Sequence, residues 1–161
     1  MLQTESYVRA LLRASLVVRD IERRVAARME RQALLIRDDA PQLWAIVDET
    51  ALTRPVGGPA TMRQQIDHLI EVSERENITL QVIRTSIGAH PGMDRSFVLL
   101  DFPNPEVFAP VVYLETATDG LYLENTEEIA RYTPMFDHLR AIALGPDESV
   151  SHLEMIKTTH E

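Results

Sequence analysis

The sequence contains no cysteine among its 161 residues and no long apolar run. The missing thiols exclude disulfides, thiolate metal sites and cysteine nucleophiles, and they fit a protein of the reducing cytoplasm. Residues 1–5 include no basic region followed by an apolar block, and every apolar stretch is far shorter than a membrane-spanning helix. We therefore predict a cytoplasmic protein with no signal peptide, no membrane span and no membrane partner.

The motifs of common cofactor and metal enzymes are absent as well. The sequence contains no Gly-x-Ser-x-Gly nucleophile motif, no phosphate-binding loop and no dinucleotide fingerprint. His68 lacks a second metal ligand four positions later, where Val72 stands, and His152 and His160 lie eight residues apart in a tail that we expect to fray. We therefore predict no metal and no cofactor.

Charge is distributed unevenly along the chain, whose formal net charge is −9. Residues 1–37 carry eight arginines and four acids, a local charge of +4, so the other 124 residues carry −13. Acids are interleaved with these arginines at helical spacing, and the segment lacks interleaved aromatic residues that could stack on bases. This pattern favours a solvated helix face, or a surface that meets an acidic patch, over a nucleic-acid arm. Because the acidic remainder would repel DNA, we predict no nucleic-acid binding by this chain alone.

Hydrophobic periodicity predicts an α+β fold. Helices are expected after Thr4, over residues 18–36, 59–75 and 126–144, and after Gly145; strands are expected over residues 43–47, 78–84, 96–102, 111–115 and 121–123. The first two strands and the helix between them predict a parallel βαβ unit, and the short turns between the later strands predict an antiparallel meander. The prediction is a mixed sheet of about five strands with one βαβ crossover, flanked by N-terminal and C-terminal helices, in a single domain over residues 1–161. Pro134 either kinks its helix or begins a second segment capped by Thr133.

Several ordered motifs resemble one protein family over nearly the whole chain. They are Leu2–Tyr7, Glu22–Arg28, Trp44–Leu52, Arg54–Pro59, Met62–Gln65, Asn77–Val82, Gly88–Gly92, Ser96–Phe102, Val112–Glu115 and Leu121–Glu124. In this order they resemble the C-terminal domain of unknown function of actinobacterial Xre-type helix-turn-helix regulators, which are described as antitoxin-like transcriptional regulators. The chain departs from that family at Pro134 and over Ile83–Ile87, and these departures would reshape a pocket locally.

The resemblance implies an effector domain that senses a signal or binds a small partner, next to a helix-turn-helix that binds DNA. These 161 residues contain no such helix-turn-helix, so we expect either a shortened regulator or a free-standing protein that kept the sensor. The first hypothesis is therefore an effector domain that binds a small molecule or a small protein and forms a homo-oligomer through its helical ends. It would lack a DNA-binding module of its own.

Two further hypotheses stay open. The missing DNA-binding module and the available histidine and carboxylate groups fit a free-standing, cofactor-independent enzyme of a natural-product pathway, such as a cyclase, isomerase or lyase. A pure oligomerisation scaffold is the third possibility.

The loop between the second and third expected strands contains the most distinctive polar residues. His90 precedes a proline, stands between Gly88 and Gly92, and is the histidine we place outside any helix or tail. A neutral imidazole there would act as a general base or bond a ligand, and Asp94 would bind a ligand from the same loop. The alternative is that His90 only fixes the turn. We expect the two glycines to form turns rather than a phosphate cradle, because no helix begins after them.

Acidic and aromatic residues of the strands complete the candidate site. Carboxylates end three expected strands and would raise one another's pKa for acid or base work, or else cap helices or pair with Arg54 and Arg84: Asp48, Glu49, Glu115 and Glu124. Aromatic residues on strands form pocket walls or ordinary core. The predicted ligand-binding residues are Trp44, His90, Asp94, Tyr113, Glu115 and Tyr122, and the enzyme hypothesis assigns catalysis to His90 and Glu115.

Overall fold

A computed structural model describes residues 1–16, 20–104, 106–116 and 119–160. The chain divides into two compact units: unit 1 comprises residues 1–85 and 143–161, and unit 2 comprises residues 86–142. The single domain over residues 1–161 stays a prediction, since one domain can be built from two such units. No helix in the described part of the chain is long and apolar enough to cross a bilayer.

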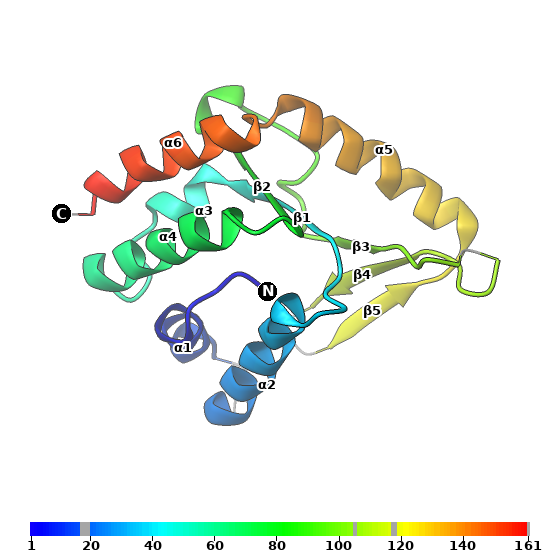
Figure 1. Cartoon of the computed structure of the whole chain (residues 1–161), viewed down its shortest axis with the longest axis horizontal. Helices are drawn as coiled ribbons and strands as arrows, with labels where there is room; N and C mark the ends of the chain where they lie inside the picture. The colour runs from blue at the N-terminus through cyan, green and yellow to red at the C-terminus, as the bar shows by residue number, and fades with distance from the viewer. Residues whose placement is uncertain (17–19, 105, 117–118, 161) are drawn as a thin grey trace. The chain divides into compact units, whose positions relative to one another are not determined.

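Unit 1 is built on a parallel strand pair (Figure 1). Strand β1 (Leu43–Asp48) pairs with β2 (Ile78–Ile83) from the first to the last residue of each strand, and the connection contains α3 (Glu49–Thr53) and α4 (Pro59–Ser73). This arrangement confirms the predicted βαβ unit. Gly58, with φ of 88°, precedes the helix-starting proline in a conformation that favours glycine.

The short helix α3 is a feature that periodicity did not predict, because five residues are too few to show a pattern. Its N-cap is Asp48, whose side chain accepts a hydrogen bond of 2.7 Å from the backbone N–H of Thr50. One of the two interpretations given for strand-end acids, helix capping, is therefore confirmed at Asp48.

Helices α4 and α6 (Pro146–Thr158) lie side by side in unit 1 (Figure 1) and contribute to its core. The largest cluster of buried apolar residues draws on the N-terminus, α3, α4, β2 and α6: Leu2, Leu35, Leu52, Ile66, Leu69, Val72, Ile78, Leu80, Val82, Leu153 and Ile156. Ser149 of α6 accepts a hydrogen bond of 3.0 Å from the backbone N–H of Val82 and is fully buried. The end of the chain is thus tied to the strand pair.

The expectation of a frayed C-terminal tail is wrong for the described residues. His152 lies within α6, and His160 is 5% exposed, with its Nε2 2.8 Å from the carbonyl oxygen of Leu52. The backbone carbonyl of His160 also accepts a hydrogen bond of 2.6 Å from Arg63. These contacts hold His160 against unit 1, because its backbone carbonyl and its imidazole both have partners there.

Two N-terminal helices form a smaller cluster in unit 1. Helix α1 (Glu5–Ala14) begins after Thr4, whose hydroxyl caps it by accepting from the Tyr7 N–H as predicted. Helix α2 (Ile21–Ala33) is followed by a 3₁₀ turn over Leu34–Ile36, so the element expected over residues 18–36 is confirmed from its residue 21 onward. Its expected start at Val18 lies outside the described residues.

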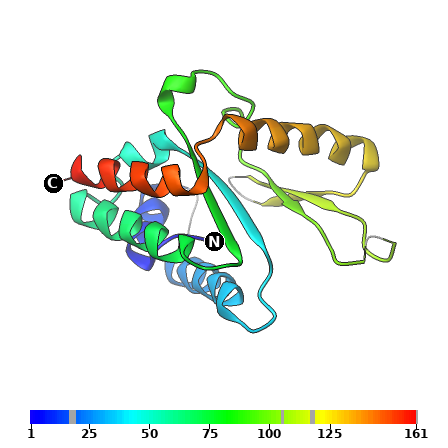
Figure 2. The same cartoon turned by 45° about the horizontal axis from the view of Figure 1, so that its top comes forward.

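Unit 2 combines an antiparallel sheet with one long helix (Figure 2). Strands β3 (Val98–Leu100), β4 (Val111–Glu115) and β5 (Gly120–Leu123) form the predicted meander, and α5 (Thr126–Ile142) lies along one face of this sheet. Pro134 is inside the continuous α5, so no second segment begins at Thr133.

The structure confirms the α+β class, with five strands, one βαβ crossover and terminal helices, and it differs from a single mixed sheet. Strands β1 and β2 form one sheet, and β3, β4 and β5 form another. In the part of the chain that the structure describes, Ser149 of α6 accepts a hydrogen bond from Val82 of β2, and β3 has three residues and pairs with β4. Alternation within a strand predicts which side chains share a face, but it does not identify the strand with which it pairs.

Candidate functional site

The strands of unit 2 bring together three of the residues that the sequence singled out. Tyr113 pairs with Tyr122 across β4 and β5, and it also pairs with Val98 across β3 and β4. Paired residues lie on the same face of a sheet, and residues alternate between faces along each strand. One face therefore carries seven residues that we call the open sheet face: Val98, Leu100, Val111, Tyr113, Glu115, Gly120 and Tyr122.

The two faces of this sheet differ in exposure. On the face covered by α5, Val112 and Leu114 are 0% and 4% exposed, and Leu139 of α5 is also buried (Figure 2). On the open sheet face, Val98 is 45% exposed and Tyr122 is 61% exposed. The open sheet face thus presents apolar and aromatic surface to solvent.

The two tyrosines form the centre of the open sheet face. Their ring centroids are 5.0 Å apart with an interplanar angle of 45°, a geometry typical of favourable aromatic pairs. A Cβ atom on Gly120 would lie 2.5 Å from Cε2 of Tyr113, so glycine at this position leaves room for the ring over β5. The sequence thus builds a pair of tilted tyrosine rings on this face, with Gly120 beside the ring of Tyr113.

The segment that contains this sheet is strongly acidic. Residues 96–130 include seven Asp or Glu residues and no Lys, Arg or His. Glu115 lies on the open sheet face itself, and Glu124 directly follows β5. A sheet within a segment whose charges are all negative attracts cationic partners and repels anionic ones.

A groove of about 370 Å³ opens elsewhere in unit 2, on the side of α5. It is lined by the loop before β3, by β5 and by one face of α5: Pro91, Asp94, Arg95, Leu123, Glu128, Arg131, Tyr132 and Met135. Tyr132 is held by an edge-to-face contact with Phe97 at 5.1 Å. The groove contains charges of both signs, so it suits a polar ligand, and Asp94 is the one predicted site residue in its lining.

His90 lies close to this groove but packs against α5. A Cβ atom on Gly92 would be 3.3 Å from both Nδ1 of His90 and Cδ2 of Leu139, so ring and leucine meet at this glycine. The carbonyl of His90 also closes a turn by accepting from the N–H of Met93 at 3.1 Å. Since Glu115 is on the open sheet face and His90 is on the α5 side, their joint catalytic role stays a prediction that these contacts do not favour.

Trp44 belongs to β1 in unit 1. Its indole Nε1–H donates a hydrogen bond of 2.7 Å to Oε1 of Gln81, and the amide of Gln81 donates one of 2.8 Å to the carbonyl of Leu144. Gln81 is 5% exposed, whereas Trp44 is 42% exposed. The tryptophan therefore has a defined structural partner, and its predicted ligand contact stays a prediction.

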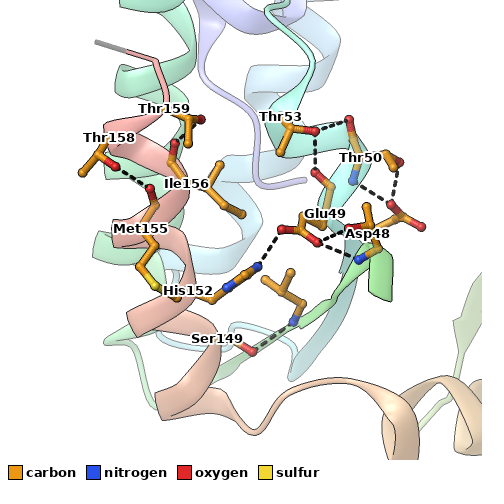
Figure 3. Close-up of polar contacts among 12 residues, drawn as sticks. Asp48, Glu49, Thr50, Thr53, Ser149, His152, Met155, Ile156, Thr158 and Thr159 are labelled. Carbon is orange, nitrogen blue, oxygen red and sulfur yellow. Dashed lines mark hydrogen bonds and ion pairs between the residues drawn. The ribbon is translucent and has the colours of Figure 1, made fainter. Parts of the chain in front are cut away.

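A second polar cluster lies where the two parallel strands of unit 1 end (Figure 3). Oε1 of Glu49 is 2.9 Å from Nε2 of His152, and Oε2 of Glu49 accepts hydrogen bonds from the backbone N–H and the hydroxyl of Thr85 at 2.6 and 2.9 Å. The side chains of Glu49 and His152 are 15% and 14% exposed. One carboxylate thus joins the start of α3, the turn that follows β2 and the middle of α6.

The electrostatics of this cluster correct one expectation. Burial raises the pKa of Glu49, but the hydrogen bonds from Thr85 and His152 outweigh it, so the pKa lies below its ordinary value. The expectation that strand-end carboxylates raise one another's pKa is therefore wrong at Glu49. The partners of Glu49 are a histidine and a threonine instead of Arg54 or Arg84. A carboxylate that orients an imidazole is suited to acid–base chemistry, and equally to fastening three elements together.

A family model described as "Domain of unknown function (DUF5753)" matches residues 1–155. The chain belongs to the DUF5753 family. Neither the curated proteins nor the solved structures contain a significant match to it. The match spans the helices, both sheets and most of α6, so the domain of unknown function inferred from the ordered motifs is confirmed.

Within this DUF5753 domain, the structure gathers only some of the predicted residues. Tyr113, Glu115 and Tyr122 share the open sheet face, Asp94 lines the groove with His90 near it, and Trp44 belongs to the other unit. Sequence reasoning missed the pairing of Glu49 with His152, since 103 residues separate them and neither stands in a recognisable motif. Glu49 directly after a strand was the one available signal.

Proposed function

We propose that this DUF5753 chain is a partner-binding effector domain, as its resemblance to the C-terminal domain of antitoxin-like Xre-type regulators implies, and that its partner binds the open sheet face. The observation that supports this proposal most strongly is an exposed apolar and aromatic sheet face within a segment that contains no basic residue. Contiguous exposed apolar surface marks interaction sites in proteins that are otherwise well packed.

The open sheet face has the composition of an interface centre. Tyrosine is enriched among the residues that contribute most to binding, and Tyr113 and Tyr122 already hold each other in place. Val98, Leu100 and Tyr122 keep 45%, 38% and 61% of their surface exposed, which leaves apolar area for a partner to bury. Burial of such side chains stabilises a complex by about 25 cal/mol per Å² of apolar area before the costs of association.

Charge selects the class of partner. Residues 96–130 contain seven acids and no basic residue, so the charge of this segment is negative. The occupant is therefore a segment of another protein with apolar side chains on one face and Lys or Arg at its margins. Such complementarity mainly raises the association rate and excludes acidic competitors.

The proposal is tested with three synthetic amphipathic peptides that share one apolar face and carry Lys, Gln or Glu on the polar face. Titration calorimetry with the full chain is expected to show saturable binding of the Lys peptide and none of the Glu peptide. Amide chemical-shift changes are expected to centre on β3, β4 and β5.

Matched variants make the test specific to one face. Tyr122→Ala is expected to lower the affinity for the Lys peptide by about tenfold, in the range of an interface hot spot. Leu121→Ala is the control, because Leu121 is 47% exposed on the opposite face of the same strand. Equal losses in the two variants, equally tight binding of the Glu peptide, or a Tyr122-dependent self-association that excludes the peptide would each contradict the proposal.

A further inference from the structure

Unit 1 contains an apolar pocket of about 250 Å³ that plays no part in the proposed function. Its wall is formed by α2, the 3₁₀ turn that follows it, α4, the start of β2 and the N-terminal segment. The residues that matter here, which we call the His68 pocket, are Leu2, Leu35, His68, Val72, Arg75 and Ile78. The four aliphatic members are all 5–8% exposed, so the wall is well packed.

His68 is the polar exception in this wall. Its Nε2 is buried and has no hydrogen-bond partner among the described residues. Leaving such an atom unpaired is costly, and orphaned buried atoms in native proteins call for an explanation such as a missing ligand. Burial lowers the pKa of His68, Glu71 raises it and Arg75 lowers it, with a net decrease, so the imidazole is neutral at pH 7.

Arg75 supplies a cation at the same pocket. His68 and Val72 are four residues apart on one stripe of α4, and Arg75 follows the C-terminal end of this helix and lines the same pocket. Both side chains line this one pocket of about 250 Å³. Arg75 is exposed, and the described residues provide no ion pair for its guanidinium.

We propose that the His68 pocket binds a small organic acid with an apolar body. The carboxylate accepts hydrogen bonds from the guanidinium of Arg75 and, after a side-chain shift that opens the solvent-shielded Nε2–H of His68, from that imidazole; the apolar body packs on Leu35, Val72 and Ile78. Arginine presents a fork of donors that matches a carboxylate, and a neutral imidazole can donate one further bond. The volume is slightly below that of typical drug-sized sites, which restricts the ligand to one ring or a short chain.

The first experiment uses 3-phenylpropanoate as the probe and 3-phenylpropanamide as its neutral match. Ligand-observed NMR and calorimetry with the full chain are expected to show saturable binding of the carboxylate, with the amide weaker by about tenfold or more. A ¹⁵N signal of the His68 imidazole is expected to shift on binding. Equal affinity for acid and amide, or an unchanged imidazole signal, overturns the proposal, as does absent binding of 3-phenylpropanoate, benzoate and octanoate alike.

Three variants separate ligand binding from structural roles. Arg75→Gln is expected to weaken 3-phenylpropanoate by about tenfold, whereas Arg84→Gln, an exposed arginine of the same unit, leaves affinity unchanged. His68→Leu removes the unpaired atom, so it is expected to weaken the probe while keeping or raising the melting temperature. The inference is contradicted if Arg84→Gln loses as much affinity as Arg75→Gln. It is also contradicted if His68→Leu lowers the melting temperature.

Discussion

Replacing Glu49 by alanine is expected to destabilise the protein through unit 1, because one carboxylate holds three elements. The side chain accepts from the N–H and hydroxyl of Thr85 and contacts Nε2 of His152, all within 2.9 Å (Figure 3). The Glu49 and His152 side chains are 15% and 14% exposed, so water replaces the carboxylate poorly at the imidazole. Thr85 is exposed, and water can satisfy its donors after the change.

The size of the effect follows from these partners. A hydrogen bond to a charged group contributes about 1.5–3 kcal/mol, but three bonds that share one carboxylate do not add independently. We therefore expect Glu49→Ala to lower the free energy of unfolding by about 2–3 kcal/mol at pH 7. Glu49→Gln keeps the volume and one acceptor oxygen, so its cost is expected to be about half as large.

The pH dependence has a defined sign. The pKa of Glu49 in the folded protein lies below its ordinary value, because hydrogen bonds to the charged form outweigh burial. A carboxyl group of this kind stabilises the fold above its unfolded pKa, about 4.3, and loses this contribution as pH falls through the folded value. The stability difference between the native protein and Glu49→Ala is therefore expected to be full above about pH 5 and to shrink in stronger acid.

Urea unfolding followed by far-UV circular dichroism, repeated from pH 7 down to pH 3, measures this difference. Glu76→Ala is the control, since Glu76 is exposed in the same unit and surface changes stay within about 0.5 kcal/mol. A Glu49→Ala cost no larger than that of the control refutes the assigned contacts. A difference that stays constant or widens toward pH 3 refutes the direction of the pKa shift.

Three further changes test the packing of each unit. Gln81→Leu removes the acceptor of the Trp44 indole, so the fluorescence of the chain's single tryptophan should shift and unfolding should become easier by about 1–3 kcal/mol; an unchanged spectrum refutes the contact. Gly120→Ala places a Cβ 2.5 Å from the Tyr113 ring, which should cost about 1–3 kcal/mol and alter the ring's NMR signals; a neutral result means that the ring does not cover Gly120. Met62→Ala empties a fully buried position and should cost about 2–5 kcal/mol in urea unfolding, against less than 1 kcal/mol if Met62 were peripheral.

Local chemistry explains why most elements were predictable. Thr4 caps α1 because its hydroxyl bonds an N–H three residues later, and Pro59 starts α4 because its fixed φ suits a first helical turn. Of the two strands around α4, the first is a short apolar run and the second has residues of two alternating faces, and they form the expected parallel pair. These signals need only neighbouring residues, so a sequence displays them directly.

Contacts between distant segments explain what was missed. Glu49 and His152 are remote in sequence, and nothing local shows that α6 returns to the end of β2. The open sheet face was half visible: Tyr113 and Tyr122 were singled out, but their pairing depends on the register of β4 and β5, and Trp44 was grouped with them because composition does not assign a residue to a sheet. The unpaired atom of His68 depends on the burial of a side chain that helical periodicity leaves ambiguous.

The division of charge between the two units gives the two proposed sites opposite preferences. Unit 2 contains nine acids and three arginines, whereas unit 1 contains sixteen acids and thirteen basic residues. A cationic partner therefore suits the open sheet face, and an anionic ligand suits Arg75 in the less acidic unit. The Lys peptide presents several cations to an acidic segment, whereas the organic acid presents one carboxylate to Arg75, so salt screens more charge–charge interactions in the first case. Raising salt from low to physiological concentration should therefore weaken the Lys peptide at unit 2 more than 3-phenylpropanoate at the His68 pocket, and an equal loss would argue that the organic acid binds only through exposed charge.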